Sequence, residues 1–401
     1  MKHTALFNGI NAALGMAQCI GLRSKHYSFD DLHIQASKAV GLTDFGPEYY
    51  QTGMRELLLS LEHDANLNPY GRLMLEKTMN GALINRLLMA QLKKRQPEIF
   101  SQPLIPPLIV TGLPRTGTTS LHRLLAADPD HRGVACWEFQ NPIPRHAKDT
   151  EQDRIKRSEK MFKLRSKVTP ELDAIHYIRA HSIEECIHFT SMTFESRLFW
   201  NLASVNSYMD WYNDAQRINK YLEYRDLLCV LQASQPNKRL VLKAPDHVDA
   251  LDALLSAVPE ALVVQTHRDP AAQLGSYLSL GMATRKLGSK SIDVEKDTES
   301  QLALTDASVN HIMAVRPALG AKIYDVQYQQ LITNPTAQIQ SIYQHFGLPY
   351  AEQNEQAFSQ HTKAHGKNKH GAHSYALEEF GLSTEGVRER YKDYSTRFIT
   401  Q

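Results

Sequence analysis

A short apolar run followed by a glycine-rich turn is the feature that most restricts how this chain can fold. Leu108 to Thr111 predict a buried strand, and an apolar helix is expected from about Ser120. The turn between them reads Gly112-Leu-Pro-Arg-Thr-Gly-Thr-Thr119. Its two glycines allow tight backbone geometry, and the helix N-terminus presents unpaired amides, so the turn can surround a phosphate. The alternative is an ordinary turn with N-capping threonines.

Further short apolar runs alternate with helical segments after this turn, which is typical of a parallel sheet built from βαβ units. The predicted strands are 108–111, 240–243, 261–266 and 323–326. Residues 1–105 are expected to be helical, because apolar residues such as Met54, Leu57, Leu58 and Leu61 recur at helical spacing. The predicted fold class is therefore α/β, with a helical N-terminal segment (1–105), an α/β domain (106–401) and a helical insertion (145–235).

Composition narrows the possible partners. The 401 residues are 42% apolar and 22% charged, which predicts a sizeable core, and the net charge of +2 is too small to indicate a nucleic-acid partner. An anion site must then be a local cluster of basic groups. The four cysteines are widely spaced, which fits a reducing, cytoplasmic compartment. No apolar run approaches the roughly 20 residues of a membrane span.

The glycine-rich turn differs from the loop of nucleotide triphosphatases. Thr118 stands where that motif carries a lysine, and no predicted strand ends in an aspartate suited to magnesium. Phosphoryl transfer from ATP depends on both groups to offset charge on the β- and γ-phosphates. A donor that lacks a triphosphate tail therefore fits this turn better.

A second candidate anion site lies at another junction of strand and helix. Arg268 follows the strand 261–266, and Ser276 comes eight residues later on the predicted helix that Asp269-Pro270 begins. An arginine at the carboxyl edge of a parallel sheet faces the ligand crevice of such folds, and its guanidinium suits a phosphate. The alternative is that Arg268 only pairs with a carboxylate such as Asp269.

In this order, the two motifs resemble those of the sulfotransferases that use 3′-phosphoadenosine 5′-phosphosulfate (PAPS). Gly112 to Thr119 is similar to their 5′-phosphosulfate loop, and Arg268 with Ser276 to their 3′-phosphate motif. The bacterial branch in particular is resembled by Leu242-Lys-Ala-Pro-Asp-His247 and by the run from Lys369-His370 through Tyr375 to Leu382. The resemblance covers most of the chain from about residue 108 to residue 394.

The resemblance implies a P-loop-like fold and in-line transfer of a sulfonyl group from PAPS, with PAP as product and no required metal. The acceptor would be a hydroxyl or amine of a small molecule, carbohydrate or lipid. The residues expected to hold the 5′-phosphosulfate are Pro114, Arg115, Thr116, Gly117, Thr118 and Thr119. Arg268 and Ser276 would hold the 3′-phosphate. The loop expected at 360–373 carries Lys367, Lys369 and His370, which either close over this phosphate or are simply solvated.

A general base must accept the proton of the acceptor, and two residues are candidates. His247 follows a strand by four residues, and an unperturbed imidazole titrates near neutral pH. Glu138 lies in the region where several carbohydrate-directed relatives carry a catalytic glutamate, although it could instead pair with an arginine. We favour His247 slightly. Lys243 and Arg115 are expected to stabilise charge during the transfer.

Other patterns leave alternatives open. His181, Glu184, Glu185 and His188 look like metal ligands on one helical stretch, but they lack the H-E-x-x-H order, so a polar helix face is favoured. The aromatic residues of the insertion, Trp200, Tyr208, Trp211 and Tyr212, could line an acceptor pocket, but at helical spacing they more often belong to the core. The competing functions are a phosphotransferase with a degenerate loop and a non-catalytic PAP-binding protein. Neither acceptor identity nor oligomeric state follows from the sequence.

Overall fold

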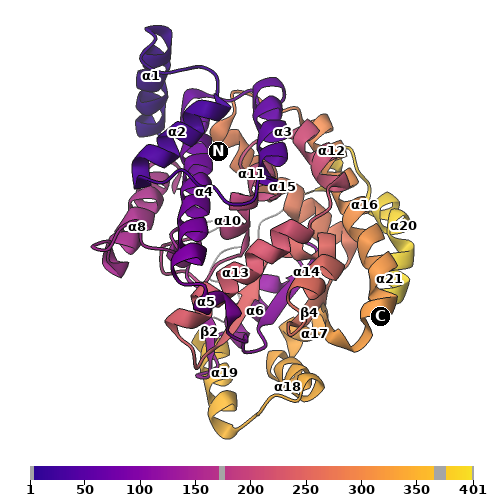
Figure 1. The fold of residues 1–401 in the computed structure, drawn as a ribbon. Helices are drawn as coiled ribbons and strands as arrows, with labels where there is room; N and C mark the ends of the chain where they lie inside the picture. Colours follow the sequence, from indigo (N-terminus) through magenta and orange to yellow (C-terminus); the bar gives the residue numbers. More distant parts are fainter. Residues whose placement is uncertain (1–3, 171–176, 365–375, 400–401) are drawn as a thin grey trace.

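A five-stranded parallel sheet lies at the centre of the molecule (Figure 1). The computed structural model describes residues 4–170, 177–364 and 376–399. The strand order is β2-β3-β1-β4-β5. The strands are β1 (Leu108–Gly112), β2 (His131–Gly133), β3 (Arg239–Lys243), β4 (Leu262–His267) and β5 (Ile323–Gln327).

Strand β1 occupies the middle of the sheet. Its residue Leu108 lies opposite Val241 of β3 on one side and Leu262 of β4 on the other. All five residues of β1 are buried, as expected for a parallel strand whose two faces are covered by helices. The four predicted strands are confirmed. The short strand β2 was not predicted, because His131 and Arg132 give it no apolar pattern.

The predicted helical character of the N-terminal segment is confirmed. Its helices are α1 (Ala5–Cys19), α2 (Phe29–Val40), α3 (Tyr50–His63), α4 (Pro69–Arg95) and α5 (Glu98–Ser101). Met54 and Leu83 from these helices share one buried cluster with Ile109 and Leu242 from the sheet. The segment therefore packs directly against the sheet.

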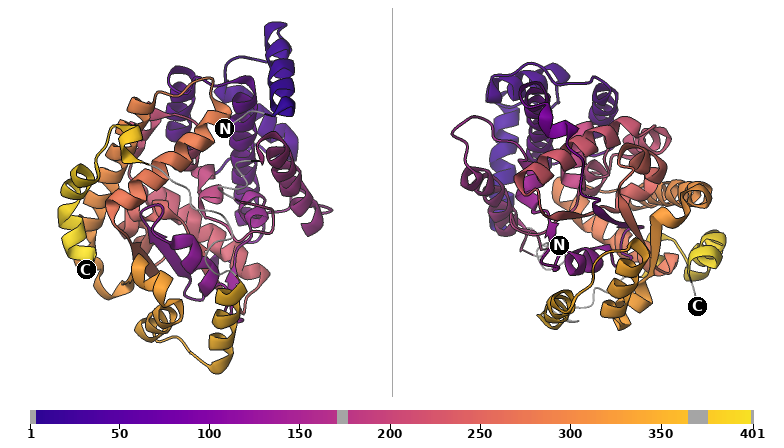
Figure 2. Two further views of the ribbon diagram at one scale, coloured as in Figure 1. Left: turned by 180° about the vertical axis from the view of Figure 1, so that it is seen from behind. Right: turned by 60° about the horizontal axis from the view of Figure 1, so that its bottom comes forward.

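The remaining helices cover the two faces and the ends of the sheet. Between β1 and β3 lie α6 (Thr118–Leu125), α7 (Cys136–Gln140), α8 (Glu151–Val168), α10 (Ile187–Thr190), η1 (Ser191–Thr193), α11 (Leu198–Leu202), α12 (Asn206–Asp214) and α13 (Ile218–Ser234). After β3 come η2 (Pro245–Ala250), α14 (Leu251–Ala257), α15 (Pro270–Gly288), α16 (Val294–Leu319), η3 (Gly320–Lys322), α17 (Tyr328–Thr333), α18 (Pro335–Phe346), α19 (Glu352–Ala364), η4 (Leu377–Phe380), α20 (Thr384–Arg390) and α21 (Lys392–Phe398). The N-terminal helices and α20–α21 lie on opposite sides of the molecule (Figures 1 and 2).

Two local predictions were wrong. Residues 360–364 belong to helix α19 and not to a loop, because Phe358 is fully buried and anchors that helix. Residues 181–186 are not helical, since the Glu184 amide donates to the carbonyl of Val134 and the Cys186 amide to that of Lys243. The segment thus lies along the sheet edge.

Two other expectations can be compared with the structure. Trp200, Tyr208 and Tyr212 are fully buried, so the core interpretation of these aromatic residues is confirmed. Among the described residues, no helix is both long enough and apolar enough to cross a bilayer.

The contact between α4 and α15 gives a test of packing. The amide of Asn68 donates to the carbonyl of Gly288, and a Cβ added at Gly71 would lie 2.0 Å from that carbonyl oxygen. We expect Gly71→Ala to lower the free energy of unfolding by about 1–3 kcal/mol, since backbone must shift. Gly81→Ala on the same helix meets no atom within 4 Å and should be neutral or stabilising by up to about 1 kcal/mol. Equal denaturant midpoints for the two variants would contradict this.

Candidate active site

The glycine-rich turn after β1 has the tight geometry that the sequence predicts. Gly112 has φ 144° and Gly117 has φ 94°, and a Cβ at Gly112 would lie 2.5 Å from the carbonyl oxygen of Thr266. Arg115 also has a left-handed backbone, with φ 68°. This conformation is unfavourable for a residue with a side chain, so contacts of Arg115 elsewhere must hold it.

Those contacts join the two predicted anion motifs. The Arg115 Nε donates to the Ser276 hydroxyl at 3.0 Å, and the Arg268 guanidinium donates to the Arg115 carbonyl at 3.0 Å. Arg268 also stacks over the ring of Tyr328, 4.2 Å from its centroid. Two basic side chains from distant parts of the chain therefore lie together at the carboxyl edge of β1 and β4.

Arg268 does not pair with Asp269. The Asp269 side chain accepts from the Ala271 amide at the start of α15, and it also forms an ion pair with Arg388. The guanidinium of Arg268 is half-buried and faces the turn, so the alternative interpretation of this arginine is wrong.

The threonines of the turn have different surroundings. Thr116 is fully buried, and its hydroxyl donates to the Leu113 carbonyl at 2.6 Å and lies 2.6 Å from the Thr266 hydroxyl. Its side chain therefore stabilises the turn, which leaves the backbone amide for a ligand. The Thr119 hydroxyl, in the first turn of α6, instead accepts from the Lys243 ammonium at 3.2 Å. Pro114 and Thr118 are buried beside them.

Lys243 brings a buried positive charge to the end of β3. Its side chain is only 2% exposed, and its Nζ forms an ion pair with the carboxylate of Glu185. The Cys186 amide donates to the Lys243 carbonyl at 2.9 Å, which fixes the segment that carries Glu185 against this strand. The sequence gave no sign of this contact, because 58 residues separate the two partners.

His247 lies two residues into the buried part of η2 and has no exposed surface. Its Nδ1 is 3.1 Å from the Tyr221 hydroxyl, and its Nε2 has no hydrogen-bond partner among the described residues. Burial lowers the pKa of His247 to about 4, against the opposing effect of the Asp246 carboxylate. The imidazole is therefore neutral near pH 7.

Glu138 is held by two contacts of its own. Its carboxylate forms an ion pair with Arg132 and accepts from the Ala135 amide at 2.9 Å, at the start of α7. Both oxygens are thus engaged in fixing the N-terminus of a short helix, and these contacts favour a structural role for Glu138.

The comparisons with known proteins agree with this geometry. The sequence profile described as the sulfotransferase family matches residues 106–352. The chain belongs to the sulfotransferase family. A curated relative, the omega-hydroxy-beta-dihydromenaquinone-9 sulfotransferase Stf3 of Mycobacterium bovis, is 24% identical over 284 residues, which are 70% of this chain and 72% of Stf3.

Two solved structures share the fold of this sulfotransferase. STF1 from Mycobacterium tuberculosis H37Rv superposes with a TM-score of 0.81 at 33% identity, over 92% of this chain and all of the STF1 chain. STF9 from Mycobacterium avium superposes with a TM-score of 0.82 at 23% identity, over 94% of this chain and 98% of the STF9 chain. The predicted fold class and family are confirmed.

The residues that looked like metal ligands do not gather into a metal site in the sulfotransferase. Among the residues that the structure describes, no group of three or more His, Cys, Asp and Glu side chains is arranged to hold a metal ion. Glu184 is buried, which raises its pKa to about 7, and His181 is exposed. Lys367, Lys369 and His370 lie outside the described residues, so their predicted role is not tested.

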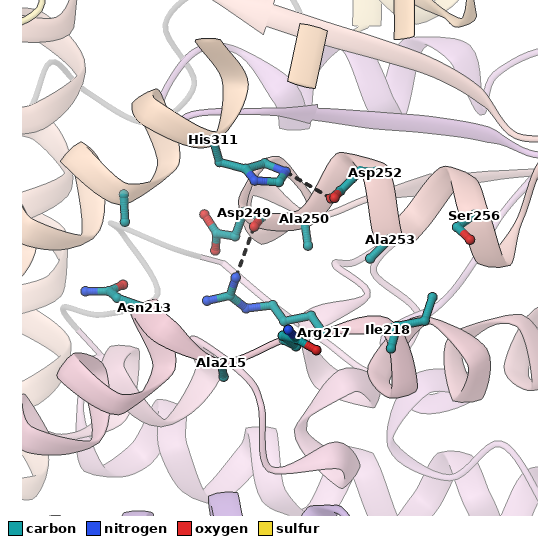
Figure 3. Close-up of a pocket in the computed structure, with 12 residues that line it drawn as sticks. Asn213, Ala215, Arg217, Ile218, Asp249, Ala250, Asp252, Ala253, Ser256 and His311 are labelled. Atoms are coloured by element: carbon teal, nitrogen blue, oxygen red, sulfur yellow. Dashed lines mark hydrogen bonds and ion pairs between the residues drawn. The ribbon is translucent and has the colours of Figure 1, made fainter. Parts of the chain in front are cut away.

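A separate cavity of about 720 Å³ lies beyond the far end of η2 (Figure 3). Arg217 extends toward Asp249 from the start of α13, and His311 of α16 extends toward Asp252 (Figure 3). No residue of the glycine-rich turn lines this cavity. It is therefore distinct from the place where Arg115, Arg268 and Lys243 gather.

The buried imidazole gives the sulfotransferase a testable dependence on pH. The pKa of His247 is about 4 in the folded protein and about 6.5 when unfolded, so the unfolded chain binds the extra proton between these values. The free energy of unfolding should fall as the pH drops from 6.5 to 4, by up to about 3 kcal/mol from this group. In His247→Asn, this part of the loss should disappear from denaturant titrations.

The control is Tyr221→Phe, which removes the hydroxyl beside His247 but keeps the imidazole buried. That variant should lose stability toward acidic pH as steeply as the wild type. Parallel curves for all three proteins would show that His247 does not contribute.

Proposed function

We propose that this sulfotransferase takes its sulfonyl group from PAPS and transfers it to a hydroxyl of a lipid-like acceptor. The supporting observation is the pair of contacts that joins Arg115 to Ser276 and Arg268 to Arg115. One continuous basic surface at the sheet edge suits a donor with phosphates at both its 5′ and 3′ positions. The acceptor class rests on Stf3, whose name gives a hydroxylated dihydromenaquinone as its substrate.

In this proposal, each part of the site has a separate task. The amides of the turn from Pro114 to Thr119 and the Arg115 guanidinium bind the 5′-phosphosulfate. Arg268 and Ser276 bind the 3′-phosphate, and the insertion 145–235 binds the acceptor. PAPS supplies an activated sulfonyl group, and PAP leaves when the bond from sulfur to the bridging oxygen breaks. Lys243, which already contacts Thr119, offsets the charge that develops on that oxygen.

Two side chains near Lys243 could receive the proton of the acceptor. The Nε2 of His247 is unpaired, but the imidazole has no exposed surface and a pKa of about 4. The carboxylate of Glu185 is partly exposed and directly contacts Lys243. An acceptor must reach the base within hydrogen-bond distance, and a pKa closer to the working pH is an advantage. We therefore assign the base to Glu185, with His247 as the competing candidate and Glu138 as a structural residue.

The donor is tested by calorimetry with PAP and AMP, which differ in the 3′-phosphate. PAP should bind more tightly than AMP, and Arg268→Ala should weaken PAP at least tenfold while leaving AMP almost unchanged, as expected for loss of a charged hydrogen bond. Arg388→Ala is the matched control, because this exposed arginine pairs with Asp269 beside the site. Equal affinity of the wild type for PAP and AMP would refute PAPS as donor.

The base is tested by turnover with ω-hydroxy-β-dihydromenaquinone-9 and PAPS, measured as PAP release. Glu185→Gln should lower kcat at least 100-fold and leave the Kd of PAP within about threefold, since the loss is in proton transfer. His247→Asn should lower kcat less. The reverse order of the two variants would assign the base to His247. Unchanged turnover in both would exclude both residues.

A further inference from the structure

Helix α1 leaves large apolar side chains in water. No charged residue occurs from Thr4 to Leu22, and Met16 is 68%, Ile20 65% and Leu22 76% exposed. The helix projects beyond the other helices of the molecule (Figures 1 and 2). Large apolar residues gathered on one surface element usually mark a binding surface for a protein or a membrane.

Helix α8 combines exposed apolar residues with positive charge. Between residues 156 and 168, the exposed side chains are Lys156, Lys160, Met161, Lys163, Leu164 and Lys167. Within the described part of the chain, these four lysines form no ion pair. A surface helix of lysines interspersed with apolar side chains is typical of elements that lie on anionic bilayers.

The two helices are joined at their ends. The Thr4 hydroxyl, which caps α1, donates to the carbonyl of Val168 at the end of α8 at 3.0 Å. Phe7 and Val168 are buried together with Tyr70 and Leu287 in a small cluster. Both helices lie along the same edge of the molecule (Figures 1 and 2), so their exposed side chains belong to one surface region.

We propose that α1 and α8 form a docking surface for a bilayer that contains anionic lipids. The apolar side chains of both helices would enter the boundary between headgroups and acyl chains, while the lysines of α8 contact lipid phosphates. Charge complementarity favours this partner over a second copy of the chain. A two-fold contact through this region would place the lysines of α8 near their own copies. The inference is independent of the proposed function, since docking requires neither PAPS nor an acceptor.

Sedimentation with vesicles tests the proposal directly, without nucleotide or acceptor. The purified protein is mixed with vesicles of phosphatidylcholine alone or with 30% phosphatidylglycerol, at low and high salt. Wild type should bind the anionic vesicles at least tenfold more tightly, and salt should weaken that binding because exposed charges are screened. Lys160→Glu with Lys163→Glu should lower binding at least tenfold.

Separate variants isolate the apolar part of the surface and control for charge. Met16→Ser with Ile20→Ser should weaken binding to anionic vesicles at least threefold, although the lysines remain. Lys322→Glu with Lys392→Glu reverses the same number of exposed charges away from α1 and α8, and should leave binding unchanged. Equal thermal unfolding temperatures would show that each variant is folded.

Three outcomes would overturn the proposal. Wild type that fails to bind anionic vesicles would do so, as would binding that the two lysine pairs lower equally. The third is self-association in analytical ultracentrifugation that Met16→Ser with Ile20→Ser abolishes while vesicle binding stays unchanged. That result would assign the apolar side chains to an interface between two copies.

Discussion

The central position of β1 in the parallel sheet determines where the other parts of the site lie. Because β1 is paired with β3 on one side and β4 on the other, the chain leaves all three strands at one edge. The turn from Gly112 to Thr119, the Lys243 ammonium and the Arg268 guanidinium therefore meet there, although about 150 residues of sequence separate the first from the last. Arg115 keeps its left-handed backbone because Ser276 and Arg268 hold it from the neighbouring strand and helix.

Buried polar contacts fix the insertion against this edge. Asp249 of η2 forms an ion pair with Arg197, and Asp246 forms one with Lys220 at 3.0 Å. Such pairs add little net stability, because both charges lose their hydration, but removing one partner commonly costs about 3–5 kcal/mol. Their effect here is positional. Since η2 also carries His247, the insertion that is proposed to bind the acceptor is tied to the element beside the reacting groups.

The sequence allowed prediction of those parts of the fold and site that depend on neighbouring residues. The strands are short apolar runs, the turn shows its glycines, and Asp269-Pro270 marks the start of α15, where the aspartate side chain accepts from the Ala271 amide. Strand β2 escaped prediction because it is short and polar. The pairing of Lys243 with Glu185 escaped for a different reason: it depends on how the segment at 181–186 lies along the sheet, and no local pattern records that placement.

The donor and acceptor sides of the site differ in how strongly they mark the sequence. Phosphates require amides, hydroxyls and guanidinium groups at particular junctions of strand and helix, and these leave motifs such as Gly112 to Thr119. An apolar acceptor requires only surface and shape, which many apolar side chains provide equally well. Trp200 and Tyr208 look the same in sequence whether they fill a core or line a pocket, and here they fill the core. For this reason, the residues that contact the acceptor have to be found by structure and by binding to lipids, whereas those that contact the donor can be found from sequence.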